Sequence, residues 1–131
     1  MSERPPFLRD LSSDHHQGLV LARHARQAAL QDASEQAQMW QEVCRSFARE
    51  LEPHFQAEEL HLFPALRTAG EDVLVEQALR EHVALRALVA EPAAPSLQAF
   101  ADLLVAHIRF EEREMFARAI QLYEQGLLNF S

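Results

Sequence analysis

The chain has 131 residues, 48% of them hydrophobic, and a formal net charge of −8 at pH 7. This length supports one core, so we expect a single domain over residues 1–131. The acidic balance argues against nucleic-acid binding, which needs clustered Lys and Arg. Cys44 is the one cysteine, which excludes an intrachain disulfide and a cysteine-based zinc cluster.

The N-terminal segment MSERPPFLRDL carries mixed charge and two prolines, and no apolar stretch follows it. It therefore does not read as a secretory signal. No apolar run approaches the roughly 18 residues that span a bilayer. These features predict a soluble, cytoplasmic protein with neither nucleic acid nor membrane among its partners.

The composition, with three glycines and abundant Ala, Leu, Glu, Gln and Arg, is typical of helices. The first predicted helix follows the cap candidates at 12–14 and runs to about Gln31. Its apolar stripe is Leu11, His15, Leu19, Ala22 and Ala29. The second predicted helix begins at Ser34 and runs to about Leu66. Pro53 can either kink this helix or divide it.

The third predicted helix begins near Glu71, after Gly70, and the EPAAPS segment at 91–96 stops it. Ser96 can cap the fourth helix, which extends to about Tyr123. Short connections between long helices favour antiparallel neighbours. The predicted fold is therefore all-α, an antiparallel up-down-up-down four-helix bundle.

A pattern in the second predicted helix recurs in the fourth, 53 residues later. HFQAEELHLF begins at His54 and HIRFEEREMF begins at His107, and both share Phe-x3-Leu-x2-His-x3-Glu-Glu-x3-Phe with the residues before them. Residues four apart lie on one helical face, so His54 points with Glu58, and His107 points with Glu111. That face is the apolar one, where a carboxylate is costly to bury without a partner.

Counting from the turns brings a histidine of every predicted helix to one level of the bundle. Glu58 precedes Gly70 by twelve residues, and His82 follows Gly70 by twelve. In the first helix, His15 or His16 reaches the same level. A single core histidine is more often a hydrogen-bonded residue than a ligand, but four of them beside two carboxylates would be a costly polar core without a metal.

The donor set of imidazoles and carboxylates, without a thiolate, indicates which metal it suits. Four-coordinate zinc would leave several groups unused. Nitrogen and oxygen ligands around two six-coordinate ions suit iron or manganese better. Glu59 and Glu112 are rotated by about 100° from their neighbours, so we expect surface or outer contacts for them. His61, one turn beyond Glu58, is an accessory candidate.

The ordered set DHH at 14–16, HFQAEELHLFPAL at 54–66, EH at 81–82 and HIRFEEREMF at 107–116 resembles the hemerythrin-like, or HHE cation-binding, family over essentially the whole chain. This resemblance implies a four-helix bundle with a non-heme di-iron centre that binds dioxygen, in which manganese or zinc can replace iron. Position by position, it implies one histidine of the DHH pair and five further ligands. The full candidate set is His15, His16, His54, Glu58, His82, His107 and Glu111.

Between the two histidines of the DHH pair, both choices stay open. His15 shares the stripe of Leu11, whereas His16 has the family-like Leu19 three residues later. The sequence also departs from the oxygen-carrying members of the family. These have two histidines one turn apart on the third helix, but here Ala78 and Arg86 lie four residues either side of the third-helix histidine.

The fourth-helix His-x3-Glu also differs from the His-x4-Asp of those oxygen carriers. Both departures favour sensing, peroxide or nitric-oxide chemistry over reversible oxygen storage. We expect a binding protein for dioxygen or a related small molecule. The alternatives are a di-iron oxidase, peroxidase or iron-repair protein, and a metal-free helical interaction module. A protein partner or a homo-oligomer stays open.

Overall fold

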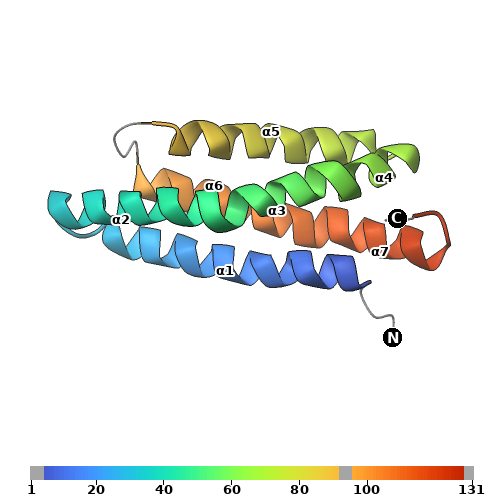
Figure 1. Cartoon of the computed structure of the whole chain (residues 1–131), viewed down its shortest axis with the longest axis horizontal. Coiled ribbons are helices and arrows are strands. Elements are labelled where there is room, and N and C mark those ends of the chain that lie inside the picture. The colour runs from blue at the N-terminus through green and yellow to red at the C-terminus, as the bar shows by residue number, and fades with distance from the viewer. Residues whose placement is uncertain (1–4, 92–95, 129–131) are drawn as a thin grey trace.

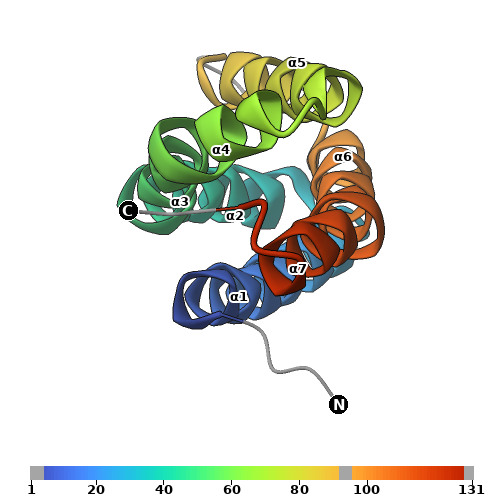
Figure 2. The same cartoon turned by 90° about the vertical axis from the view of Figure 1, so that its right-hand side faces the viewer.

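The computed structural model describes residues 5–91 and 96–128 and contains helices without strands in that part of the chain. Four helical rods pack side by side (Figures 1 and 2). They are α1 (Pro6–Ala28), a rod from Ala33 to Thr68, α5 (Asp72–Val89) and a rod from Leu97 to Glu124. The predicted all-helical bundle is confirmed. None of the described helices is both long enough and apolar enough to cross a bilayer.

The first helix starts earlier than the sequence predicted. It begins at Pro6. Proline suits the first turn of a helix, because the N–H that it lacks would have no helical partner there. The expected start after residues 12–14 was wrong because Leu8 and Leu11 are buried and extend the apolar stripe towards the N-terminus. The helix ends at Ala28, three residues before the expected end.

The buried stripe of α1 also differs at one position. Leu19 is 39% exposed, and Gly18 faces inward instead. A Cβ atom at Gly18 would lie 2.9 Å from Cδ1 of Ile108 on the fourth rod. The missing side chain therefore allows α1 to approach the fourth rod closely, three residues after His15.

The second rod is continuous through both of its prolines. It consists of α2 (Ala33–Ser46), η1 (Phe47–Leu51), α3 (Glu52–Ala57), η2 (Glu58–Leu62) and α4 (Phe63–Thr68), where η marks wider π-type turns. The N–H of Glu52 donates to the carbonyl of Phe47, and the N–H of Phe63 donates to that of Glu58. Each proline is the second residue after one of these widened turns, and the helix continues through Pro53 rather than being divided there.

The fourth rod consists of α6 (Leu97–Phe110), η3 (Glu111–Phe116) and α7 (Ala117–Glu124). The Ser96 hydroxyl accepts a hydrogen bond from the N–H of Ala99 at 3.0 Å, which confirms the predicted cap. Of the predicted breaker at 91–96, residues 92–95 lie outside the described part of the chain. The widened turn η3 begins at Glu111 just as η2 begins at Glu58, so this half of the sequence repeat is also a repeat of backbone geometry. The other half is not, because the counterpart of η1 in the fourth rod is ordinary α-helix.

Two apolar clusters fill the bundle and leave a polar layer between them. One includes Trp40, Phe47, Phe100 and Leu104, and the other includes Leu62, Phe63, Met115 and Phe116. In every rod the polar residues lie at the boundary between the side chains of one cluster and those of the other. We call this group the polar layer, and its members are His15, His54, Glu58, His82, His107 and Glu111.

Candidate metal centre

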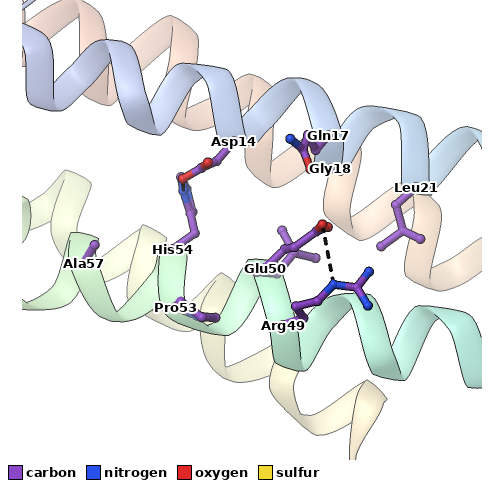
Figure 3. A pocket seen from close by; sticks show the side chains of 10 residues that line it. Asp14, Gln17, Gly18, Leu21, Arg49, Glu50, Pro53, His54 and Ala57 are labelled. Atoms are coloured by element: carbon purple, nitrogen blue, oxygen red, sulfur yellow. Dashed lines mark hydrogen bonds and ion pairs between the residues drawn. The ribbon is translucent and has the colours of Figure 1, made fainter.

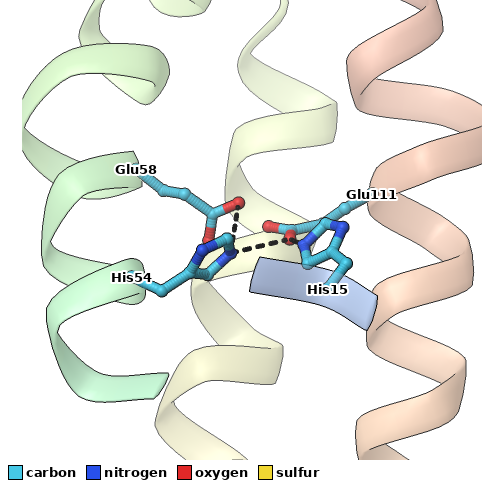
Figure 4. A group of neighbouring side chains, drawn as sticks. All are labelled: His15, His54, Glu58 and Glu111. Atoms are coloured by element: carbon cyan, nitrogen blue, oxygen red, sulfur yellow. Dashed lines mark hydrogen bonds and ion pairs between the residues drawn. The ribbon is translucent and has the colours of Figure 1, made fainter. Parts of the chain in front are cut away.

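All four rods contribute to the polar layer, and none of its six side chains is more than 4% exposed. His15 comes from α1, His82 from α5, and each of the other rods supplies a His–Glu pair. Figure 4 shows Glu58 and Glu111 reaching towards each other from different rods, with His54 and His15 beside them. Helical spacing of four residues makes each pair converge, because it returns the side chain to the same face.

Glu111 directs one carboxylate oxygen towards His15 and His54 and the other towards His82 and His107, the two halves of the layer. Its Oε1 lies 2.8 Å from Nε2 of His15 and 4.0 Å from Nε2 of His54. Its Oε2 lies 3.3 Å from Nε2 of His107 and 3.7 Å from Nε2 of His82. The carboxylate therefore stands between two pairs of imidazoles.

Glu58 also directs one oxygen to each half of the layer, but each of its oxygens lies near one imidazole rather than two. Its Oε2 lies 3.5 Å from Nε2 of His54, and its Oε1 lies 3.1 Å from Nε2 of His82. The layer thus divides into two groups of potential ligand atoms, each with all its atoms within 4.8 Å of one another, and both carboxylates belong to both groups. The groups are His15, His54, Glu58 and Glu111, and Glu58, His82, His107 and Glu111.

The polar atoms at the centre fit a cation. They lack hydrogen-bond partners although they are fully buried: Nε2 of His54, His82 and His107, both carboxylate oxygens of Glu58, and Oε2 of Glu111. An unsatisfied buried polar group costs about 1–3 kcal/mol, and more when it is charged. Lone pairs that face one another across a dry layer are compensated by protons or by metal ions, and imidazole and carboxylate are established ligands for such ions.

Each imidazole has a second carboxylate behind it, at the ring nitrogen that faces away from the centre. Nδ1 of His54 lies 3.0 Å from Asp14, that of His82 lies 2.7 Å from Glu59, and that of His107 lies 2.6 Å from Glu81. Nδ1 of His15 lies 3.4 Å from Glu112. For His54, His82 and His107, a carboxylate in this position holds the proton on Nδ1 and leaves the Nε2 lone pair free to bind a metal, as in carboxylate–histidine–metal triads.

Sequence reasoning anticipated outer contacts for Glu59 and Glu112 but missed Asp14 and Glu81. A signal was present, because each of these two acids directly precedes a layer histidine, in DHH and in EH. One residue corresponds to a rotation of about 100° around a helix, so the acid does not face the histidine next to it in the chain. Asp14 and Glu81 instead support histidines of neighbouring rods.

The two glutamates dominate the electrostatics of the layer. Burial alone would lower the pKa of each imidazole, but the nearby carboxylates of Glu111 and Glu58 outweigh it. The pKa is raised to about 11 for His54, about 9 for His82 and about 10 for His107. Burial opposes ionisation of Glu111, yet the charge on His107, the hydrogen bond with His15 and the nearby His54 bring the pKa of this carboxyl well below its usual value. Without metal, the layer therefore holds protons.

The structure separates the two histidines that the sequence left open. His15 is 4% exposed and lies in the polar layer, whereas His16 is exposed on the surface of α1, one residue further round the helix. His16 therefore stands outside both groups of potential ligand atoms. His61 is also exposed, with its ring edge-on to that of Phe7, so it is not brought to the layer either.

A pocket of about 400 Å³ lies between α1 and the second rod (Figure 3). It reaches the pair formed by His54 and Asp14, on the side of the imidazole that faces away from the layer. Gly18 and Pro53 form part of its walls, together with the charged side chains of Arg49 and Glu50. The pocket therefore brings solvent to an outer carboxylate of the layer.

An all-helical bundle with overlapping, buried His/Glu groups in its core defines a protein equipped to hold metal ions. A family model, the hemerythrin HHE cation binding domain, matches residues 7–119. The chain belongs to this family, as the sequence resemblance indicated. No curated protein and no solved structure gives a match to the chain.

Proposed function

We propose that this chain is a non-heme di-iron protein that binds dioxygen or a related small molecule. The observation that carries the proposal is the pair of ligand groups that share Glu58 and Glu111. Two ions that shared Glu58 and Glu111 would be held by His15 with His54 and by His82 with His107, and so would use every member of the polar layer. The predicted antiparallel up-down course belongs to the same proposal. It is supported by Figure 1, where the α1–α2 connection lies at one end of the bundle and the α4–α5 connection at the other.

The donor chemistry favours iron over the alternatives. Four imidazoles and two carboxylates form a mixed nitrogen and oxygen set, which suits iron or manganese in six-coordination. Zinc would bind these ligands but would leave part of a four-coordinate set unused. We therefore propose iron as the resident ion, with manganese and zinc as ions that can replace it.

The ligand count and the burial favour a small molecule as the partner. If both glutamates bridge, the protein fills about eight of twelve positions around two six-coordinate ions, which leaves room for a diatomic ligand. The apolar clusters above and below exclude water and large substrates. Bound iron would supply redox-active positions for such a ligand. The chain's own residues hold the ions, orient the imidazoles through outer carboxylates and keep the layer dry.

The third rod favours sensing or reactive chemistry over storage. His82 is its one member of the polar layer, and Ala78 and Arg86 occupy the positions one turn away. With fewer imidazoles, an ion has more positions for solvent or exogenous ligands. A di-iron oxidase, peroxidase or iron-repair role is the second candidate, and the same observation favours it.

The test is to load the protein with ferrous iron without oxygen and then mix it rapidly with dioxygen, nitric oxide or peroxide. A binding protein gives a stoichiometric spectral change, which reverses when the gas is removed. An oxidase or peroxidase consumes many equivalents of its oxidant per chain. An iron-loaded protein that responds to none of the three would contradict the proposed function.

A further inference from the structure

Arg86 lies on α5 one turn after His82 and bridges two acids of the second rod. Its Nη1 donates to Oε2 of Glu59 at 2.8 Å, and its Nη2 donates to the other oxygen at 3.2 Å. The same guanidinium donates to Glu52 through Nε at 2.8 Å and through Nη2 at 2.6 Å. A planar guanidinium with several fixed donors suits this double fork, whereas a lysine ammonium does not.

Oε2 of Glu59, which accepts a hydrogen bond from Nη1 of Arg86, is also the partner of the His82 imidazole. The distance from Nδ1 of His82 to Oε2 of Glu59 is 2.7 Å. Phe55 completes the arrangement, because its ring stacks on the His82 ring at a centroid distance of 3.8 Å and lies 5.6 Å from the guanidinium carbon. The orientation of His82 is therefore fixed by one contact at its edge and one on its face.

The four outer carboxylates are not held equally. A guanidinium fork holds Glu59, whose side chain is 25% exposed. The amide of Gln77 donates to Glu81 at 3.2 Å, a neutral and longer contact. Asp14, which supports His54, is 53% exposed and lines the pocket of Figure 3. Glu112, behind His15, is 27% exposed and accepts a hydrogen bond from the Ser12 hydroxyl at 3.3 Å. Among the other three, support is strongest behind His82 and most accessible to water behind His54.

We propose that Arg86 is a positioning residue that fixes the His82 imidazole through Glu59, so that the metal position of His82 and His107 releases its ion more slowly than that of His15 and His54. The inference rests on the proposed two-metal centre. Loss of Arg86 leaves Glu59 free to turn towards solvent, and the fully buried His82 then loses the partner of its Nδ1–H. Outer partners of this kind change metal affinity by roughly 10- to 100-fold.

The experiment loads the protein with two equivalents of Co²⁺ and follows the loss of its visible bands after addition of excess EDTA. We expect two phases of release. Arg86→Gln accelerates the slow phase by roughly 10- to 100-fold and leaves the fast phase unchanged. Asp14→Asn, which weakens the support of His54, accelerates the fast phase alone.

Matched variants separate positioning from a general loss of structure. Arg67→Gln removes a guanidinium that also bridges two acids, Asp72 and Glu76, but does not contact the polar layer, and both phases stay unchanged. Arg86→Lys keeps the charge without the fork and gives an intermediate rate. If Arg86 acts through Glu59, adding Glu59→Gln to Arg86→Gln produces no further acceleration.

A second readout does not depend on release kinetics. In the cobalt-loaded protein, the Nδ1 proton of His82 gives a paramagnetically shifted, exchangeable NMR signal, which broadens or disappears in Arg86→Gln and persists in Arg67→Gln. Equal acceleration of both phases, additive effects of the two substitutions, or a single rate in the parent protein would overturn the inference while leaving the two-metal centre intact. Binding of fewer than one cobalt per chain would overturn the proposed function itself.

Discussion

Removing the metal should lower the stability of the bundle without unfolding it. The metal-free layer contains the partnerless nitrogens of His54, His82 and His107 together with the oxygens of Glu58 and Glu111. Protons compensate part of this, because the glutamates raise the pKa of His54 to about 11 and of His107 to about 10. The two apolar clusters remain packed in the metal-free protein, so its helices persist.

The expected size follows from mass action. An ion that binds only the folded chain stabilises it by about 4 kcal/mol when its free concentration is about 1,000 times its Kd. For a domain of this length, 1 kcal/mol corresponds to roughly 3–6 °C in melting temperature. One ion held at that ratio therefore raises the melting temperature by at least about 10 °C, and a second ion adds to the shift.

The assay is thermal unfolding followed by circular dichroism, with and without added ferrous iron under anaerobic conditions. The metal-free protein should show the same helical signal at low temperature and melt at least about 10 °C lower. His82→Ala, which removes the contribution of the third rod to the layer, should lose much of the same stabilisation. Coincident melting curves would refute the reasoning, because these histidines would then be ordinary core residues.

Three further predictions use matched variants or pH. Glu58→Ala should abolish most metal binding, whereas Glu59→Ala, which removes an outer partner of His82, should lower metal affinity by only about 10- to 100-fold. Metal analysis after equilibrium dialysis distinguishes the two variants. Equal losses would mean that the wrong carboxylate is assigned as a ligand. His15→Ala should reduce the stoichiometry towards one ion per chain and His16→Ala should leave it unchanged, which the same analysis tests. Metal affinity should rise from about pH 6 to pH 8, because ions displace protons from imidazoles such as that of His82, whose pKa is raised to about 9. The stability of the metal-free protein should instead fall over this range. The proton on His82 stabilises the fold fully below the unfolded pKa of about 6.5, and this stabilisation is lost as the pH rises through about 9. Calorimetric metal titrations and melting curves over this range would expose a wrong sign.

The sequence predicted the helices well where periodicity and a capping residue coincided. Ser96 and the fourth helix are an example, because this capping serine directly precedes the first residue of a long apolar stripe. The start of α1 was missed because the cap candidates at 12–14 lie inside the helix, whereas its buried stripe already begins at Leu8 and Leu11. The widened turns were also missed. Helix propensities do not show where a backbone N–H will donate to the carbonyl five residues earlier, as it does just before Pro53 and Pro64.

The level of the polar layer could be predicted because helices rise by a constant amount per residue. Counting from Gly70 was enough to bring Glu58 and His82 together, and the structure has them 3.1 Å apart. Contacts between rods depend on how each helix is rotated about its axis. The support of His54 by Asp14, and the fork of Arg86 on Glu59, therefore required the structure.

The most direct test of the account is the metal content of the iron-reconstituted protein. Protein purified without chelators, reconstituted anaerobically with ferrous iron and freed of excess by gel filtration, should contain about two iron ions per chain, and after air oxidation it should absorb in the near ultraviolet as bridged ferric iron does. The parallel sample of Glu111→Ala, which lacks the carboxylate that faces all four histidines, should retain little iron. A parent protein with clearly less than one iron per chain would contradict the claim that the polar layer is a two-metal centre.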